Sequence, residues 1–376
     1  MTEAELQAAV RAFVRDEVAP AAAAWSMGAA PDPALLGRAG ALGLMRIQVP
    51  AEAGGLGLGF AAKARAAETL ARADFGFAMS VVNTQNVALR LVASAERRVW
   101  EPLLPDLLSG RSSACTALTE PGAGSDFASI STTARRDGEG WRLDGEKCWV
   151  INARHAAFAI VYAQCGEPGD RDGIGAFLVP LDRPGCSRYP LDAPFAQTSM
   201  GTGGFRLEGV RIPADHVVFA PGQAFGAILD EINGARAYVA AMCCGMLGAA
   251  IEAAGDYGES RRSFGRALAG HQAWRLALAR AGVALAAARA ITAEAVAAVD
   301  RGAPAQLAAA QAKIAAVDTC RRQLPELLHL MGAEGLRPQH PFSRHLAAAE
   351  IATLTDGSTE MLLERVHRLM RRAPAP

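Results

Sequence analysis

The stretch ALTEPGAGSDFAS, residues 117–129, carries more structural information than any other part of this 376-residue sequence. Gly122, Gly124 and Ser125 allow the backbone to turn sharply, so that successive N–H groups point into one concavity. The Thr119 hydroxyl adds a side-chain donor and acceptor to the same loop. Such a loop suits a phosphate or the polar edge of a flat heterocycle, and an ordinary surface turn is the alternative.

The sequence changes character on both sides of this loop, which divides the chain into three regions. Residues 1–114 are predicted to be helical, and residues 115–221 hold short β-branched and aromatic runs that predict a small β domain. Residues 222–376 are predicted to be helical again. This α–β–α order is unlike a doubly wound sheet, so a cofactor would be bound without a dinucleotide-binding βαβ unit. The glycine-rich VPAEAGGLGLGF, residues 49–60, does not alter this, because no strand precedes it.

Several individual elements are also predicted. Apolar residues at helical spacing near the N-terminus indicate one buried stripe, made by Leu6, Val10, Phe13 and Val14. Further helices are expected over residues 33–43, 61–74, 272–298, 304–330 and 358–372. An interior proline costs roughly 3 kcal/mol, so Pro325 is expected to kink or restart its helix. Asp144-Gly145, between two strand-like segments, predicts a hairpin.

The composition argues against several classes of function. Lys plus Arg and Asp plus Glu number 38 each, a balance without the electrostatic footprint of a nucleic-acid or membrane-surface protein. No apolar run approaches the ~20 residues of a membrane span, and the N-terminal MTEAELQAAV is unlike a targeting peptide, so a cytoplasmic location is expected. The seven cysteines include no C-x-x-C pair and the histidines are scattered, so neither disulfides nor a metal site is expected.

Two more stretches combine aromatic and polar residues. GEKCWVINA, residues 145–153, predicts Trp149 as a flat face on the rim of a strand, with core packing as the alternative. RRSFG, residues 261–265, is followed by a His-Gln pair near the start of a helix. There Arg261 suits a diphosphate and Phe264 suits stacking on a purine, whereas a solvated basic turn is the alternative.

Together these stretches resemble the acyl-CoA dehydrogenase family. TEPGAGSD, EKCWVINA, RRSFG with HQ, LLHLMGAEG and DGST occur in the family's order and spacing, and VPAEAGGLGL is similar to the family's P-E-x-x-G-G-x-G-L. The resemblance covers nearly the whole chain, and TEPGAGSD is its most specific motif. It implies an α+β multi-domain fold: an N-terminal helical domain over residues 1–114, a central β-barrel-like domain over 115–221 and a C-terminal four-helix bundle over 222–376.

The same resemblance implies a cofactor, a substrate and partners. The cofactor is FAD, the substrate is an acyl thioester of CoA or of an acyl-carrier protein, and electrons pass to an electron-transfer flavoprotein. The chain is expected to form a homo-oligomer, a tetramer or a dimer, with no nucleic acid, membrane or metal.

The resemblance also assigns site residues. Those that it places at FAD, partly across a subunit interface, are Thr116, Leu118, Thr119, Gly124, Ser125, Trp149, Ile151, Arg261, Ser263, Phe264, Gln272, His329, Gly332, Ala333, Gly357, Ser358 and Thr359. Those that it places at the substrate are Ser125, Asn233, Arg236, Asp356 and Gly357.

Asp356 occupies the position of the family's usual catalytic glutamate, in E-G-T-S. Family members use this carboxylate to remove the α-proton while the β-hydride goes to flavin N5. An aspartate withdraws its carboxylate by about 1.5 Å, and misplacement on that scale costs roughly 10²-fold in rate. The alternative is a structural aspartate that caps the next helix. The position where some members carry the base is Ala235 here, and nearby Asp230 and Glu231 are weaker candidates.

Three departures from the family pattern indicate a specialised member. Ile151 replaces a Thr or Ser that bonds flavin N5, the segment SMGTGGFRLEGVRIP is short, and Asn233 replaces an acid near the CoA adenine. Two other functions stay open. One is a flavin oxidase of the nitroalkane-oxidase branch, which shares the aspartate but carries an arginine where Leu363 stands here. The other is a flavin-binding relative whose catalysis has decayed.

Overall fold

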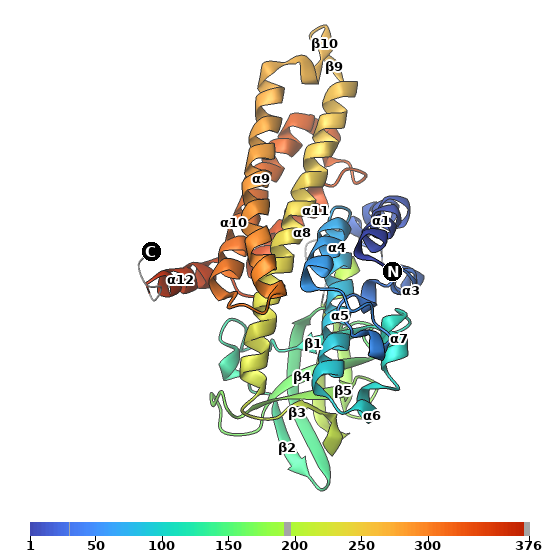
Figure 1. Cartoon of the computed structure of the whole chain (residues 1–376), viewed down its shortest axis with the longest axis vertical. Coiled ribbons are helices and arrows are strands. Elements are labelled where there is room, and N and C mark those ends of the chain that lie inside the picture. The colour runs from blue at the N-terminus through green and yellow to red at the C-terminus, as the bar shows by residue number, and fades with distance from the viewer. Residues whose placement is uncertain (30, 192–196, 372–376) are drawn as a thin grey trace.

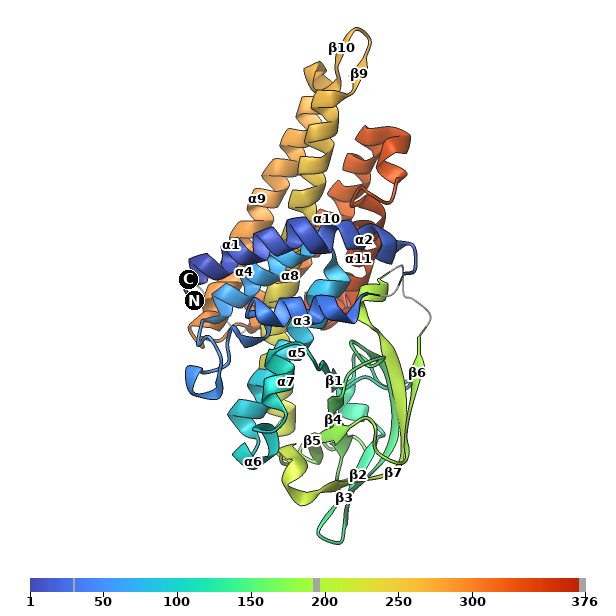
Figure 2. The ribbon, with the colours of Figure 1, turned by 90° about the vertical axis from the view of Figure 1, so that its right-hand side faces the viewer.

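The computed structural model describes residues 1–29, 31–191 and 197–371, with a helical block near each end of the chain and a sheet between them. Figure 1 shows the sheet at one end of the molecule and the long C-terminal helices extending toward the other end. Figure 2 shows the first N-terminal helices lying between these two parts. The predicted α–β–α order is therefore confirmed.

The N-terminal block contains α1 (Glu3–Phe13), α2 (Ala19–Ser26), α3 (Pro33–Ala41), α4 (Phe60–Ala71), α5 (Phe75–Ser94), α6 (Arg97–Trp100) and α7 (Leu104–Leu108). Thr2 caps α1 and exchanges hydrogen bonds with Glu5, which satisfies two free N–H groups at the helix start. The predicted apolar stripe is buried, and the helices predicted over residues 33–43 and 61–74 are confirmed as α3 and α4. Asp74 caps α5 by accepting a hydrogen bond from Phe77 N at 2.7 Å.

The central sheet contains β1 (Ala114–Ala117), β2 (Thr133–Asp137), β3 (Gly140–Val150), β4 (Phe158–Gln164), β5 (Ile174–Pro180), β6 (Cys186–Pro190), β7 (Gly203–Pro213) and β8 (Val217–Phe219). Its order is β6-β7-β3-β2-β4-β5-β8, and β1 pairs with β4 in parallel. The edge strands β6 and β8 do not pair with each other in the described part of the chain. The barrel-like domain expected from the resemblance is thus a mixed sheet that does not close.

The hairpin predicted at Asp144-Gly145 is wrong, because β3 continues through both residues. The turn lies at Gly138 and Glu139, between β2 and β3. At Gly145 the pairing of β3 with β7 shifts in register, which marks a bulge. A side chain there would meet Thr132 Oγ1 at 2.5 Å, so glycine serves the close approach of two backbones.

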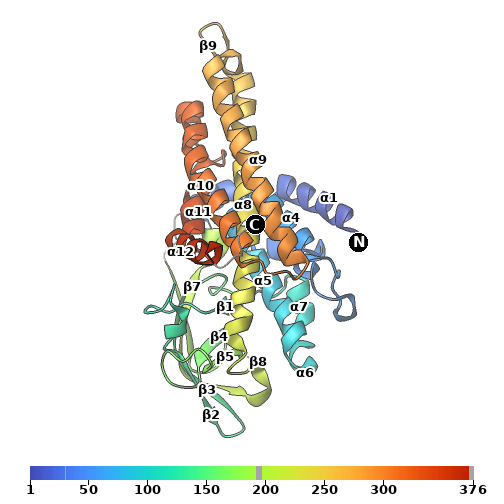
Figure 3. The same ribbon diagram turned by 60° about the vertical axis from the view of Figure 1, so that its left-hand side comes forward.

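The C-terminal block contains α8 (Ala224–Ser260), α9 (Gln272–Asp300), α10 (Gln306–Met331), α11 (Phe342–Leu354) and α12 (Thr359–Met370). The short strands β9 (Arg262–Ser263) and β10 (Arg266–Ala267) form a hairpin between α8 and α9. α8 packs against α4, α9 and α10, and α12 lies against α10 (Figure 3). α10 continues through Pro325 to Met331, so the helix does not restart there, and the alternative of a kink stays a prediction.

By length and composition α8 and α9 are both apolar enough to cross a membrane, which the sequence did not lead us to expect. In α8 the most apolar window is 78% buried inside the protein, as in the core helix of a folded domain. In α9 the corresponding window is only 28% buried, so much of its apolar surface is uncovered in a single chain.

Buried apolar side chains join the three regions. The largest cluster packs N-terminal helices such as α4 against α8 and α10. A second cluster contains Val87 and Leu91 of α5 together with Ile160 and Tyr162 of β4. The end of α5 therefore lies where the helices and the sheet meet. The domain boundaries at 114 and 221 remain predictions.

Candidate active site

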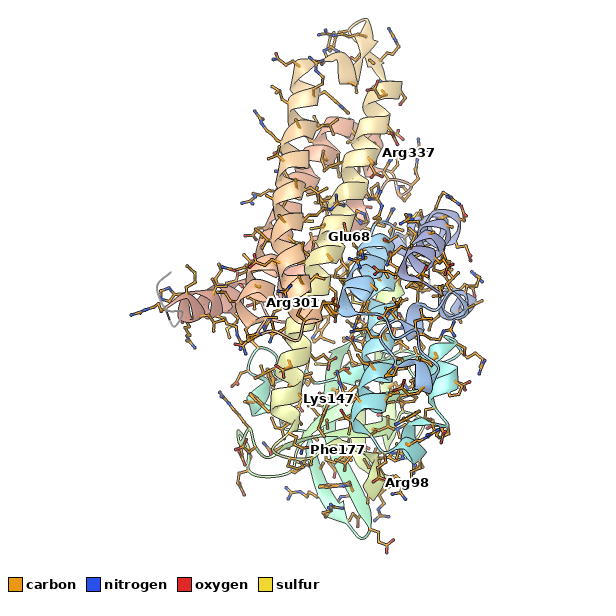
Figure 4. All side chains as sticks on the ribbon, viewed as in Figure 1. Glu68, Arg98, Lys147, Phe177, Arg301 and Arg337 are labelled. Carbon is orange, nitrogen blue, oxygen red and sulfur yellow. The ribbon has the colours of Figure 1, made fainter. Side chains whose placement is uncertain are left out.

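The loop after β1 is fastened to the sheet by a buried ion pair. On β3, Lys147 Nζ lies 2.7 Å from Glu120 Oε1 and donates to Leu118 O at 2.9 Å. Both charged side chains are buried, and Figure 4 places Lys147 within the sheet domain. The same Oε1 accepts from Thr132 N at 2.9 Å, and Glu120 Oε2 accepts from Ser131 N at 2.6 Å. The start of the loop is thus fixed.

These contacts control the charge of Glu120. Burial alone raises its pKa, but the Lys147 ammonium and the hydrogen bonds from Lys147, Thr132 and Ser131 lower it to about 2. The far end of the loop is different, because side chains built at Gly122 or Gly124 would meet no described atom within 4 Å. The loop therefore has accessible backbone at Gly122 and Gly124 and a start that is held in place, which suits the binding of a ligand.

Trp149 lies on the rim beside this loop, at the end of β3. Its side chain is 59% exposed, so the alternative of core packing is wrong. Cys148 N donates to Thr119 O at 3.0 Å, which ties the rim to the loop. Ile151, predicted beside the flavin, is half-buried against the main helical core.

Asn152, to which the sequence assigned no role, holds this rim in place. Its Nδ2 donates to Ser80 O at 2.9 Å and to Ala114 O at 3.1 Å, and its Oδ1 accepts from Ser80 Oγ at 2.6 Å. One buried amide therefore ties β3 to α5 and β1. The one sequence signal available for it was the residue type, since asparagine tolerates left-handed backbone better than most residues.

Four non-glycine residues of the described chain have positive φ: Trp149 (56°), Asn152 (68°), Phe264 (51°) and Asp356 (56°). All four lie in motifs singled out from the sequence. Such backbone costs of order 1–3 kcal/mol and concentrates at functional sites, where the surroundings enforce it. The strain therefore supports a functional role for the rim, the α8–α9 hairpin and the loop before α12.

Asp356 does not cap the helix that follows it. The N-cap of α12 is Ser358, whose hydroxyl accepts from Met361 N at 3.4 Å. Asp356 Oδ2 is buried and meets no hydrogen-bond partner in the part of the chain that the structure describes. Its backbone N–H also meets no acceptor among the described residues. The alternative of a capping aspartate is thus wrong, and the carboxylate is free to act on a ligand.

Two buried cations clamp the loop that carries Asp356. Lys313 Nζ, from α10, donates to Gly357 O at 2.5 Å and also to Thr355 O. Arg236 Nε, from α8, donates to Asp356 O at 3.0 Å. Three successive carbonyl oxygens are thus held, which explains how the strained backbone at Asp356 is maintained.

The clamp sets the electrostatics of the carboxylate. Burial raises the pKa of Asp356 above its ordinary value of 3.8, while the charges of Lys313 and Arg236 act in the opposite direction. Burial lowers the pKa of Lys313 to about 8, against the effect of Asp356. The carboxylate is therefore a stronger base than an exposed aspartate but can still ionise.

The other candidate bases on α8 are less suited to this role. Glu231 forms an ion pair with Arg90 of α5, Asp230 is exposed, and Ala235 is buried without a titratable group. Arg236 also donates Nη1 to Asn233 Oδ1 at 2.9 Å. The two predicted substrate contacts, Asn233 and Arg236, are therefore bonded to each other, and their contact with a substrate stays a prediction.

We expect Lys313→Met to lower the rate of substrate-dependent flavin reduction roughly 10²-fold, because the freed loop misplaces the carboxylate. Stopped-flow absorbance of the flavin measures this rate. Arg321→Met is the matched control, since it removes a cation of the same helix that pairs at the surface with Glu350. A Lys313→Met rate equal to that of the control would show that the clamp does not position the base.

Most of the remaining predicted cofactor residues lie apart from the sheet-domain loop within one chain, whereas Gly357, Ser358 and Thr359 directly follow Asp356. Arg261, Ser263, Phe264 and Gln272 surround the α8–α9 hairpin, at the end of the molecule opposite the sheet (Figure 1). Phe264 is 94% exposed there. His329, Gly332 and Ala333 lie at the C-terminal end of α10, and Gly357 to Thr359 lead into α12. A single chain does not bring these groups together, as expected for a site shared between subunits.

Three comparisons with known proteins agree with one another. The family descriptions "Acyl-CoA dehydrogenase, N-terminal domain", "middle domain" and "C-terminal domain" match residues 1–111, 115–210 and 222–370. Human mitochondrial short-chain specific acyl-CoA dehydrogenase is 32% identical over 93% of this chain and 85% of that protein. Butyryl-CoA dehydrogenase from Megasphaera elsdenii has a similar structure (TM-score 0.93, 25% identity, 99% of each chain). So does glutaryl-CoA dehydrogenase from Mycobacterium smegmatis (TM-score 0.91, 27% identity, 99% and 95%).

Proposed function

Because this chain belongs to the acyl-CoA dehydrogenase family, we propose that it desaturates an acyl thioester, with Asp356 as the base that removes the α-proton. The family makes it an oxidoreductase acting on CH–CH groups, with FAD as its cofactor. The observation that carries the proposal for Asp356 is its buried, unpartnered carboxylate oxygen on a loop clamped by two cations. A coenzyme A thioester is the proposed substrate, since the relatives are named for acyl-CoA.

The residues of the sheet domain fit a flat heterocycle. An exposed indole face lies beside a loop with open backbone at Gly122 and Gly124, and the Lys147–Glu120 pair holds that loop still. FAD, when bound, supplies the acceptor for the β-hydride. The residues proposed to hold its ring from this chain are Thr116, Leu118, Thr119, Gly124, Ser125, Trp149 and Ile151.

Asp356 carries out the proton transfer in this proposal. Its raised pKa brings the carboxyl closer to neutral pH, where a general base is most effective. Its free backbone N–H is available to polarise the thioester carbonyl, which stabilises the charge that develops as the proton leaves. Lys313 and Arg236 hold the loop, so the chain keeps both groups in place before the substrate arrives.

A second copy of the chain completes the cofactor site in this proposal. Phe264 and its neighbours are too far from the sheet domain to serve the same chain, and the apolar surface of α9 is largely uncovered. A homo-oligomer that covers α9 would bring the hairpin of one copy toward the sheet of another. An electron-transfer flavoprotein is the proposed electron acceptor, and the cytoplasm is the proposed location.

The test of the function is anaerobic mixing of the purified holoenzyme with a panel of acyl-CoA thioesters. We expect a yellow protein whose flavin absorbance is bleached by at least one thioester, because electrons have no acceptor beyond the flavin. Bleaching by nitroalkanes and by no thioester would instead support the oxidase alternative. A colourless protein that takes up no FAD would support the decayed relative.

A further inference from the structure

The chain has only three lysines, and all three are buried. Lys147 and Lys313 hold loops of the site through oxygen acceptors, as described above. Lys63, on α4, differs from both, because its one hydrogen-bond acceptor among the described residues is the side-chain amide oxygen of Asn86. Burial and then the nearby Arg90 guanidinium lower the pKa of Lys63 to about 7, and no carboxylate of the described residues opposes them.

The charges around Lys63 do not balance. Arg90 and Lys63 are both buried cations, and the one carboxylate paired with either in the described structure is Glu231, which pairs with Arg90. An isolated ammonium is costly to bury unless an anion compensates it. The Lys63 site is thus incomplete in the chain alone, and a bound anion would complete it.

This incomplete site lies beside the proposed reaction site. Lys63 Nζ is 5.4 Å from the centroid of the Tyr238 ring, and Asn86 Nδ2 donates to the Tyr238 hydroxyl at 3.3 Å. Tyr238 lies on α8 two residues after Arg236, whose Nε donates to Asp356 O at 3.0 Å, so the helix that carries this phenol also holds the loop of the base. On the other side, Arg90 Nη1 lies 3.4 Å from Thr116 Oγ1, on the strand proposed to line the flavin.

Resting on the proposed function, we propose that Lys63 binds a carboxylate at the distal end of the acyl group, so that the substrate is a short dicarboxylyl thioester. Lys63 would form the ion pair, Asn86 would orient its ammonium and the Tyr238 ring would flank the chain between the ion pair and the base. A plain alkyl chain in the same place would leave the ammonium buried and unpaired, which disfavours it as a substrate.

The test compares matched thioesters on the holoenzyme. Glutaryl-CoA is compared with its neutral isostere 5-methylhexanoyl-CoA, in which methyl groups replace the carboxylate oxygens, and adipyl-CoA with 6-methylheptanoyl-CoA. We expect kcat/KM for flavin reduction to favour a dicarboxylyl thioester by at least about 10-fold. Lys63→Met should lower kcat/KM for the dicarboxylyl thioester roughly 10²-fold, because one partner of a buried ion pair is lost. It should change kcat/KM for the neutral isostere by less than about 3-fold.

A control separates this effect from loss of the fold. Arg65→Met removes a cation two residues away on α4 that pairs with Glu3 at the surface, and it should leave the preference unchanged. Lys63→Met should itself melt no lower than wild type, since it replaces an unpaired buried charge by an apolar side chain of similar size. Neutral isosteres that bleach the flavin faster than dicarboxylyl thioesters would overturn this proposal alone. If no thioester bleaches the flavin, this proposal and the proposed function fail together.

Discussion

Asp356→Asn should abolish flavin bleaching by the best acyl-CoA, with a loss of about 10²–10⁴-fold or more, while FAD stays bound. The amide keeps the size and shape of the side chain but cannot accept the α-proton. No contact that holds the loop is removed, because Lys313 and Arg236 bind backbone oxygens there. Anaerobic stopped-flow absorbance measures the rate, and the flavin spectrum of the purified variant measures cofactor content.

The matched variant Asp356→Glu restores the side-chain length that the family usually carries at this position. It should keep its rate within about 10²-fold of wild type, since the reach of the carboxylate changes but its chemistry does not. If Asp356→Asn reduces its flavin at the wild-type rate, the base lies elsewhere and the proposed mechanism is wrong.

The same carboxyl links activity to stability. Because burial raises the pKa of folded Asp356, this group stabilises the fold below its ordinary pKa of 3.8, and that contribution is lost as pH rises through the folded pKa. At neutral pH the ionised carboxylate, whose buried Oδ2 has no hydrogen-bond partner among the described residues, therefore lowers the free energy of unfolding. Asp356→Asn should raise the melting temperature at pH 7, and the gain should shrink toward pH 4.

Lys147→Met should lower the free energy of unfolding by about 3–5 kcal/mol, because it leaves the Glu120 carboxylate buried without its partner. The loop that Lys147 holds through Leu118 O and Glu120 would also loosen, so most of the FAD should be lost on purification. Urea denaturation followed by circular dichroism measures the first effect, and the ratio of flavin to protein absorbance measures the second.

Arg206→Met is the control for this prediction. It removes an exposed cation on β7 that lies 3.1 Å from Glu146, and surface pairs of this kind contribute only about 0–1 kcal/mol. The double variant Lys147→Met with Glu120→Gln should be less destabilised than the sum of the two single changes, because neither charge is then left alone. Equal losses in Lys147→Met and Arg206→Met would contradict the role of the buried pair.

The pair also predicts how stability depends on pH. The pKa of Glu120 falls from its ordinary value of 4.5 to about 2 in the folded protein. The contribution of the Glu120 carboxylate to the free energy of unfolding is therefore fully present above about pH 4.5 and is lost as pH falls through 2. Glu120→Gln should lose stability at neutral pH and should respond less than wild type to acid between pH 4.5 and 2.

Much of the secondary structure could be predicted from local patterns. The apolar spacing of α1, the alanine-rich run of α9 and the helices around them follow from helical periodicity and propensity. Predictions from single residues failed where contacts with distant parts of the chain determined the local backbone. Gly145 indicated a hairpin, but the close approach of Thr132 makes it a bulge in a continuing strand. Pro325 indicated a kink or a restart, and α10 continues through it without a restart.

By itself the sequence determined the family, the order of the domains and the position of the candidate base, because motifs such as TEPGAGSD and DGST are contiguous along the chain. Only the tertiary structure decided what holds that base and the cofactor loop. Arg236 and Asp356 are 120 residues apart, and Asn152 and Ser80 are 72 apart. That Lys63 meets an amide and not a carboxylate among the described residues likewise depends on which side chains converge in the core. Burial and charge pairing arise between segments that are far apart in the sequence, so they cannot be predicted from a local sequence pattern.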